Sequence, residues 1–266
     1  MPNAIADTLY DKKDLGIHTE MLTTNMMKLA KAGVITGRKK QLQNGKMVCT
    51  FIMGSPELYA FAHDNPSDEI LAGSYTNDPY VIAQNDNMVS INSTIEIDLT
   101  GQCASESLGS TQFSGTGGQA DTAIGAQNSK GGRSFICLRS TYKDQKGERH
   151  SNVVPWLPEG SIVSMLKNYV MFLVTEWGIA DVFLKTYQER IKAMCEQAHN
   201  AGKLTIAEFV EDAASMSILF SCGINFVQGN FLQEPEQACL VDSVFFVIVG
   251  VCSFLVPVLL NQPLHD

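Results

Sequence analysis

The stretch "VSINSTIEIDL", residues 89–99, alternates apolar and polar side chains along almost its whole length. The apolar set that faces one way consists of Val89, Ile91, Ile95, Ile97 and Leu99. The polar set that faces the other way consists of Ser90, Asn92, Thr94, Glu96 and Asp98. Because successive side chains of a β-strand point to opposite faces, this pattern predicts one strand with a single apolar face.

Strand and helix patterns alternate on both sides of this stretch. Apolar runs typical of buried strands occur at 46–54, 134–138 and 170–174. Apolar residues at helical spacing predict a helix over 21–33, closed by Gly33, and a second over 179–201, closed by Gly202. Strands interleaved with helices, together with one alternating strand, favour an α/β fold with a mixed sheet flanked by helices.

The residues after Gly202 form a short strand–helix–strand pattern over 204–232, followed by an apolar C-terminal segment. Such a small unit cannot bury both faces of its sheet alone, so we expect it to pack on the rest of the chain. All 19 Lys and Arg side chains precede Leu204, whereas seven acidic residues follow Lys203. This charge shift predicts a boundary, and we expect domains at 1–200, 201–238 and 239–266.

Composition narrows the class of protein. A net charge of −9 argues against a nucleic-acid partner, which requires a basic surface. The seven cysteines form no C-x-x-C pair, and the first residues lack the apolar core of a signal peptide, so we expect a reduced, cytoplasmic protein. Residues 243–260 carry no charge over 18 positions, but Pro257 and the lack of flanking basic residues make membrane contact the less favoured interpretation.

Two features invite a chemical interpretation. "FSGTGGQAD", residues 113–121, places three glycines in four positions, yet it lacks both the third glycine of a dinucleotide fingerprint and the lysine of a phosphate-binding loop. Glu20 follows an apolar run, where the residues alone favour a carboxylate in the first turn of a helix. The five histidines show no metal-ligand spacing, so we expect no metal site.

Six motifs occur in order in the first three quarters of the chain: "LGIHTEML", "AGVITG", "YTNDPYVIAQNDNMVSINSTIEIDLTGQ", "SGTGGQAD", "SKGGRSFICL" and "VTEWGIADV". Together they resemble the C-terminal half of the acetyl-CoA hydrolase/transferase family over about residues 9–199. Within this family they resemble the 4-hydroxybutyrate and butyryl-CoA:acetate CoA-transferases. The resemblance implies a CoA-transferase-like lobe, and we expect a homo-oligomer.

The resemblance also implies a reaction and a set of site residues. In this family a catalytic glutamate, which falls on Glu20, attacks an acyl-CoA thioester and passes through an anhydride to a glutamyl-CoA thioester. Acyl-CoA and a small carboxylate are the substrates, and no tightly bound cofactor is expected. Gly118 or Gly117 would donate a backbone N–H to the oxyanion, and the Asn77 amide would assist. Glu176 matches a family motif but receives no role beyond bracing the sheet.

Alternatives stay open at this point. Asn77 could instead form an Asx-turn before Pro79. Water could replace the acceptor carboxylate, which would make the protein an acyl-CoA hydrolase. The family's N-terminal half, which contributes to the CoA cleft, has no counterpart here, and Lys167 lies where the family carries an arginine. A catalytically inactive binding module is therefore a further alternative.

A second resemblance covers residues 202–236, which look like the end of an EAL-type cyclic-diguanylate domain. Glu208, Glu211 and Gln228 fall on its functional positions. The other strands of that barrel, with the remaining metal-binding carboxylates, have no counterpart in the sequence. A metal site cannot assemble from the ligands of one strand, so we expect a packing unit without phosphodiesterase activity.

Overall fold

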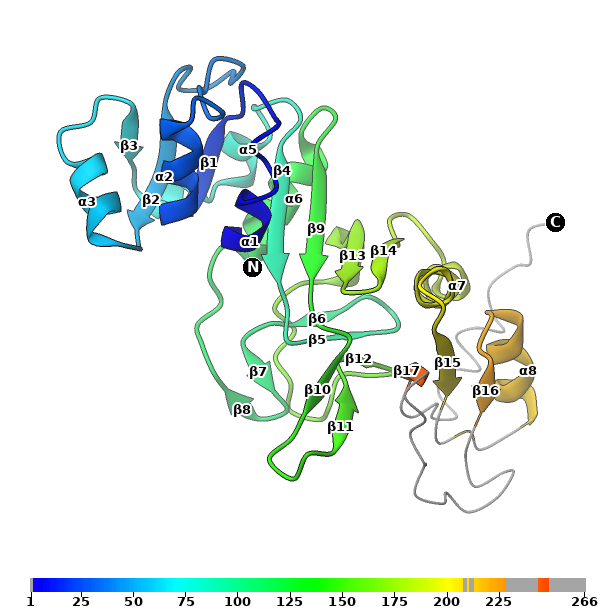
Figure 1. The fold of residues 1–266 in the computed structure, drawn as a ribbon. Helices are drawn as coiled ribbons and strands as arrows, with labels where there is room; N and C mark the ends of the chain where they lie inside the picture. Colours follow the sequence, from blue (N-terminus) through cyan, green and yellow to red (C-terminus); the bar gives the residue numbers. More distant parts are fainter. Residues whose placement is uncertain (1, 208–209, 211–212, 228–243, 249–266) are drawn as a thin grey trace. The chain divides into compact units, whose positions relative to one another are not determined.

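A computed structural model describes residues 2–207, 210, 213–227 and 244–248 (Figure 1). The chain divides into two compact units: residues 1–91 with 118–134 form one, and residues 92–117 with 135–266 form the other. The mixed α/β fold predicted from the sequence is confirmed. The predicted domain boundaries at 200 and 238 stay predictions.

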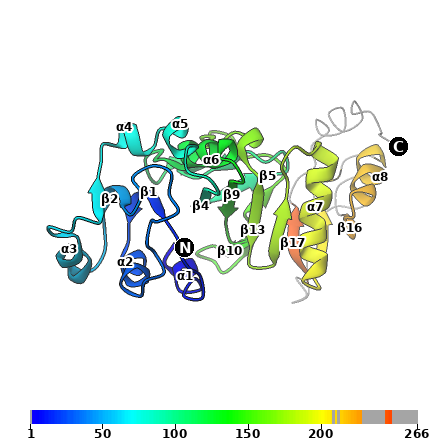
Figure 2. The ribbon, with the colours of Figure 1, turned by 90° about the horizontal axis from the view of Figure 1, so that it is seen from above.

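The first unit is built on a parallel three-stranded sheet with the order β1 (Ile17–Leu22), β2 (Met47–Ile52) and β3 (Asp68–Ile70). Three helices accompany it: α1 (Pro2–Ala6), α2 (Thr24–Lys31) and α3 (Pro56–Ala62). Figure 2 shows α2 and α3 on one face of this sheet and α4 (Gly73–Thr76) on the other. One apolar core cluster joins the sheet to α2 and α3, and its buried members are Leu22, Met27, Cys49 and Leu58.

The predicted helix over 21–33 begins later than expected. Leu22 is the last residue of β1, and α2 starts at Thr24. The chain after α2 turns at Gly33, which has a φ of +75°, a conformation that glycine adopts without steric cost.

Two further helices complete the first unit: α5 (Pro79–Ile82) and α6 (Gln119–Asn128). They pack closely, because a Cβ placed on Gly125 of α6 would lie 2.5 Å from the Ile82 side chain. This glycine therefore fixes how near α6 comes to α5.

The chain also contains a four-stranded mixed sheet. Its strand order is β14 (Gly178–Asp181), β13 (Phe172–Thr175), β9 (Arg133–Cys137) and β4 (Val89–Ser93). β13 is parallel to β9 and antiparallel to β14. A smaller three-stranded sheet has the order β12 (Val153–Val154), β5 (Glu96–Asp98) and β6 (Cys103–Ala104). Two short hairpins are also present: β7 (Ser107–Leu108) with β8 (Thr111–Gln112), and β10 (Thr141–Lys143) with β11 (Arg149–Ser151).

The single strand predicted over residues 89–99 is wrong, because β4 ends at Ser93 and β5 begins at Glu96. The break lies at Thr94, whose Oγ1 lies 2.9 Å from the carbonyl oxygens of both Ala104 and Glu96, so its hydroxyl can donate to either. Most of the predicted polar face, including Ser90, Thr94 and Glu96, is also buried, and Asp98 is fully enclosed. Its carboxylate accepts four hydrogen bonds from Thr100 and Gln102, which offset the cost of burying the charge.

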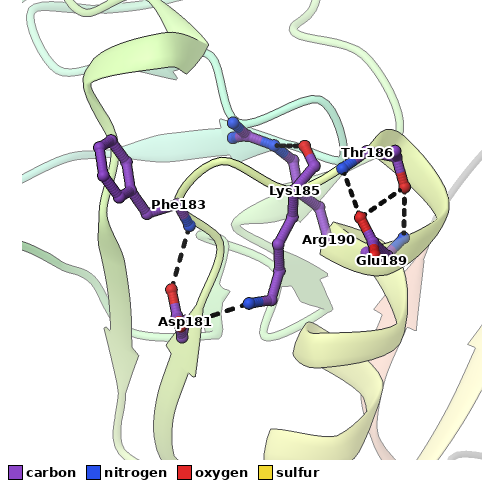
Figure 3. A network of polar contacts seen from close by, with 6 residues as sticks. All are labelled: Asp181, Phe183, Lys185, Thr186, Glu189 and Arg190. Atoms are coloured by element: carbon purple, nitrogen blue, oxygen red, sulfur yellow. Dashed lines mark hydrogen bonds and ion pairs between the residues drawn. The ribbon is translucent and has the colours of Figure 1, made fainter.

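The helix predicted over 179–201 begins eight residues later, as α7 (Tyr187–Asn200). Figure 3 shows the reason: Thr186 and Glu189 form a reciprocal capping box that starts the helix. Asp181, at the end of β14, accepts hydrogen bonds from the backbone of Phe183 and the side chain of Lys185. These contacts shape the turn between strand and helix, where apolar periodicity alone suggested continuous helix.

The C-terminal part contains β15 (Leu204–Ala207), α8 (Ala213–Ser221) and β16 (Phe226–Val227), the predicted strand–helix–strand pattern. β15 also pairs in parallel with β17 (Val244–Ile248). In the described part of the chain, no helix has both the length and the apolar character of a membrane span. Glu208, Glu211, Gln228 and most of the 243–260 segment lie outside the described residues.

Burial of Glu96 in β5 generates a prediction about pH and stability. Its side chain is 4% exposed, and Oε2 has no hydrogen-bond partner among the residues described. Burial raises the pKa of this carboxyl to about 7. The folded state therefore holds the proton more tightly than the unfolded state, so the free energy of unfolding falls as the pH rises from 4.5 to about 7.

Glu96→Gln removes this titration. In urea unfolding experiments, we expect the free energy of unfolding of the variant, relative to that of the parent chain, to increase by roughly 2–3 kcal/mol as the pH rises from about 5 to about 8. The exposed Glu159→Gln substitution is the control and should show no such gain. If the free energies of unfolding of Glu96→Gln and of the parent chain differ by the same amount at the lower and at the higher pH, the prediction is contradicted.

Candidate active site

Glu20 is the point at which three segments of the first unit meet. It lies near the C-terminal end of β1, within the parallel sheet, and not in a helical turn as the residues alone suggested. Its Oε2 accepts a hydrogen bond of 2.8 Å from the backbone N–H of Gly118 and one of 3.2 Å from Nδ2 of Asn77. Residues separated by 57 and 98 positions in the sequence thus converge on one carboxylate oxygen.

Gly118 is the N-cap of α6, and its closeness to Glu20 explains why the position is a glycine. Its φ of −95° and ψ of 18° are accessible to other residues, so backbone freedom is not the reason. A Cβ at this position would lie 2.4 Å from Glu20 Oε2 and 2.7 Å from Asn77 Nδ2. The absent side chain therefore allows the carboxylate to approach the N–H at the positive end of the helix.

Asn77 follows the last residue of α4 and turns its side chain toward Glu20. The alternative interpretation, an Asx-turn at Asn77, is wrong. Asp78 makes that turn instead, by accepting the backbone N–H of Tyr80 at 2.8 Å. The same turn at Asn77 would need an N–H on Pro79, which proline lacks. Asn77 Oδ1 is buried and has no hydrogen-bond partner among the described residues.

The second oxygen of Glu20 is left open. In the described part of the chain, Oε1 accepts no hydrogen bond, and the residue is half-buried. The surroundings are negative: burial, followed by the charges of Glu20 and Asp78, raises the pKa of Asp121 in the first turn of α6. A carboxylate with one oxygen held and the other open can present the open oxygen to a reaction partner, and partial burial reduces its contact with water.

The other two predicted site residues are found in the second unit. Gly117 has a φ of +62°, and a Cβ there would meet nothing within 4 Å, so turn geometry accounts for this glycine. Glu176 follows β13 and binds the turn after β9: its carboxylate accepts the backbone N–H of Ser140 at 2.8 Å and the Ser140 hydroxyl at 2.9 Å. Glu176 thus links the ends of two adjacent strands, and its bracing role stays a prediction.

Sequence reasoning missed His18, whose Nε2 lies 2.8 Å from the carbonyl oxygen of Thr76. The only available signal was that His18 and Glu20 are two positions apart in a strand and therefore share a face. Among the described residues, one group has metal-ligand spacing: Asp144, Glu148 and His150 on the β10–β11 hairpin. Asp144 already accepts the backbone N–H groups of Lys146 and Glu148 there.

Comparison with known proteins shows to which family the chain belongs. The sequence profile of the acetyl-CoA hydrolase/transferase C-terminal domain matches residues 54–208, more than half of the chain. The chain belongs to the acetyl-CoA hydrolase/transferase family. The matched range includes Asn77, Gly118 and Glu176, whereas Glu20 precedes it. A profile of the EAL domain also matches residues 183–235.

The chain is 46% identical over 199 residues to the 4-hydroxybutyrate coenzyme A transferase of Clostridium kluyveri, covering 75% of this chain and 46% of that relative. It is 40% identical over 201 residues to the butyryl-CoA:acetate CoA-transferase of Anaerostipes caccae, covering 75% and 45%. The crystal structure of RipA from Yersinia pestis matches with a TM-score of 0.68 and 41% identity, over 74% of this chain and 44% of RipA. The chain thus spans about half the length of the curated relatives it matches.

Two glycines of the same loop provide a matched test of the geometry. A Cβ on Gly118 would overlap Glu20 and Asn77, whereas a Cβ on Gly115 would meet nothing within 4 Å. In urea unfolding experiments we expect Gly118→Ala to lower the free energy of unfolding by about 1–3 kcal/mol, because the neighbours must move. Gly115→Ala should change it by less than about 0.5 kcal/mol. Equal effects of the two substitutions would contradict the close packing around Glu20.

Proposed function

We propose that this chain carries the catalytic glutamate of an acyl-CoA:carboxylate CoA-transferase, with Glu20 as the nucleophile. The observation that supports this most is the pair of N–H donors on Oε2, which leaves Oε1 open. The names of the relatives support short acyl groups, such as butyryl or 4-hydroxybutyryl, with acetate or a similar small carboxylate as acceptor.

The first step would use the open oxygen. Oε1 attacks the carbonyl carbon of the acyl-CoA thioester, the C–S bond breaks, and CoA leaves as a thiolate. The product is a mixed anhydride in which the former Oε1 bridges the acyl group and the Glu20 side chain. Aiming and partly desolvating the carboxylate serve this step, because a carboxylate is a weak nucleophile in water.

The second step would use the two donors. The CoA thiolate attacks the Glu20 carbonyl carbon, and the negative charge that develops falls on Oε2. Gly118 N–H and Asn77 Nδ2 already contact this oxygen, so stabilising the charge requires no rearrangement. Collapse of this intermediate expels the first carboxylate together with the bridging oxygen and leaves a glutamyl-CoA thioester. An acceptor carboxylate then collects CoA by the reverse sequence.

The remaining sequence-based expectations belong to this proposal. We expect a cytoplasmic homo-oligomer that uses CoA as a substrate and holds no resident cofactor. The segments 201–238 and 239–266 would be separate from the transferase domain at 1–200. The match of the EAL profile to 183–235 supports a distinct origin for the first of these segments.

The glutamyl-CoA thioester provides the test. After incubation with butyryl-CoA, we expect peptide mass mapping to find CoA attached to Glu20, and hydroxylamine to release it. Glu20→Gln should form no adduct. The control Glu57→Gln removes an exposed carboxylate of the same unit that pairs with Lys31, and it should form the adduct as the parent chain does. A folded parent chain that forms no adduct would contradict the proposal and favour an inactive binding module.

The same preparation separates transfer from hydrolysis. Acetate should discharge the adduct with formation of acetyl-CoA, whereas buffer alone should discharge it slowly. Release of free CoA at the same rate in buffer and in acetate would identify a hydrolase instead.

A further inference from the structure

His18 is the buried polar side chain nearest in sequence to the proposed nucleophile. It precedes Glu20 by two positions in β1, so both side chains lie on the same face of the strand. The ring is 7% exposed, and its Nε2 lies 2.8 Å from the carbonyl oxygen of Thr76. Thr76 is the last residue of α4, and the next residue is Asn77.

The hydrogen bond assigns the proton of the ring. A carbonyl oxygen only accepts, so Nε2 must be the donor. The carbonyl groups of the last turn of a helix have no partner within that helix, and His18 supplies one for Thr76. Nδ1 is buried and has no hydrogen-bond partner among the residues that the structure describes. A second ring proton would therefore be left without an acceptor.

We propose that His18 is a positioning residue, which ties the end of α4 to β1 so that Asn77 Nδ2 stays on Glu20 Oε2. Strand β1 then fixes both partners of the Asn77–Glu20 hydrogen bond. His18 holds the backbone next to Asn77, and Glu20 accepts the hydrogen bond from the Asn77 amide. Asn77 itself follows the helix end with no regular element between it and Asp78, which caps the next helix. Without the tie, the donor would lose its fixed distance to the oxygen.

The electrostatic surroundings agree with a neutral ring. Burial lowers the pKa of His18, and the nearby positive charge of Lys40 lowers it further, against the opposing effect of the Thr76 carbonyl. A neutral imidazole keeps its single proton on Nε2, where the hydrogen bond needs it.

This inference rests on the proposed function. Its test uses variants that distinguish loss of the hydrogen bond from loss of side-chain volume. Glutamine places a donor nitrogen as many bonds from Cα as Nε2 of histidine, whereas leucine fills similar space without a donor. Ser129→Ala is the matched control, since it removes a buried 2.7 Å hydrogen bond to the Asn85 carbonyl elsewhere in the same unit.

We expect His18→Leu to slow formation of the Glu20–CoA thioester by about tenfold or more at saturating butyryl-CoA, with little change in the half-saturating concentration. His18→Gln should stay within about threefold of the parent chain, because it restores the donor. Ser129→Ala should also leave the rate near that of the parent chain. Equal losses for the Gln and Leu variants, or no loss for Leu, would overturn the inference.

A second readout does not depend on activity. The side-chain amide resonances of Asn77, measured by NMR on the full chain, should differ between His18→Leu and His18→Gln, because both variants lack the imidazole ring and only the Gln variant restores the donor. Absence of the thioester in the parent chain would contradict the proposed function alone, and the NMR comparison would still decide the role of His18. Identical Asn77 resonances in His18→Leu and His18→Gln would overturn it.

Discussion

The structure of the site depends on one hydrogen bond, from the backbone N–H of Gly118 to Oε2 of Glu20. It joins the C-terminal end of β1 to the beginning of α6, where the backbone N–H groups have no partner within the helix. The contact requires a residue without a Cβ, and the position is a glycine for that reason. Asn77 reaches the same oxygen from α4, so strand, helix and turn are all fixed relative to one carboxylate.

This arrangement divides the work between the two oxygens of Glu20. In the proposed reaction Oε2 carries the developing charge, and Oε1 forms and breaks bonds. Donors that already sit on Oε2 need not reorganise when the charge appears, which is how a preorganised site lowers a barrier. Burial, followed by the nearby charges of Glu20 and Asp78, raises the pKa of Asp121 beside this carboxylate. In the proposed site, His18 does not contact the reacting atoms but holds the end of α4, so that Asn77 stays on Oε2.

Sequence patterns predicted the fold class and most elements, because periodicity reports directly which faces are buried. They failed where local hydrogen bonds decide the structure. The contacts of Thr94 divide the alternating stretch into two strands, and the Thr186–Glu189 capping box makes α7 begin later than its apolar periodicity predicted. Periodicity alone also left Glu20 in a helical turn, and only the family motifs gave it a chemical role. The link from His18 to Thr76 joins residues 58 positions apart, and no local pattern announces such a contact.

The most direct test of the central claim follows the oxygen atoms of Glu20. During turnover of butyryl-CoA with acetate that carries heavy oxygen in its carboxylate, each cycle should replace the bridging oxygen of Glu20 with one from acetate. If Gly118 and Asn77 hold Oε2 throughout, mass spectrometry of the Glu20 peptide should show one heavy oxygen and no more, even after many turnovers. Continued CoA exchange without heavy oxygen in that peptide would show that Glu20 is not the nucleophile, and two heavy oxygens would show that Oε2 is not held.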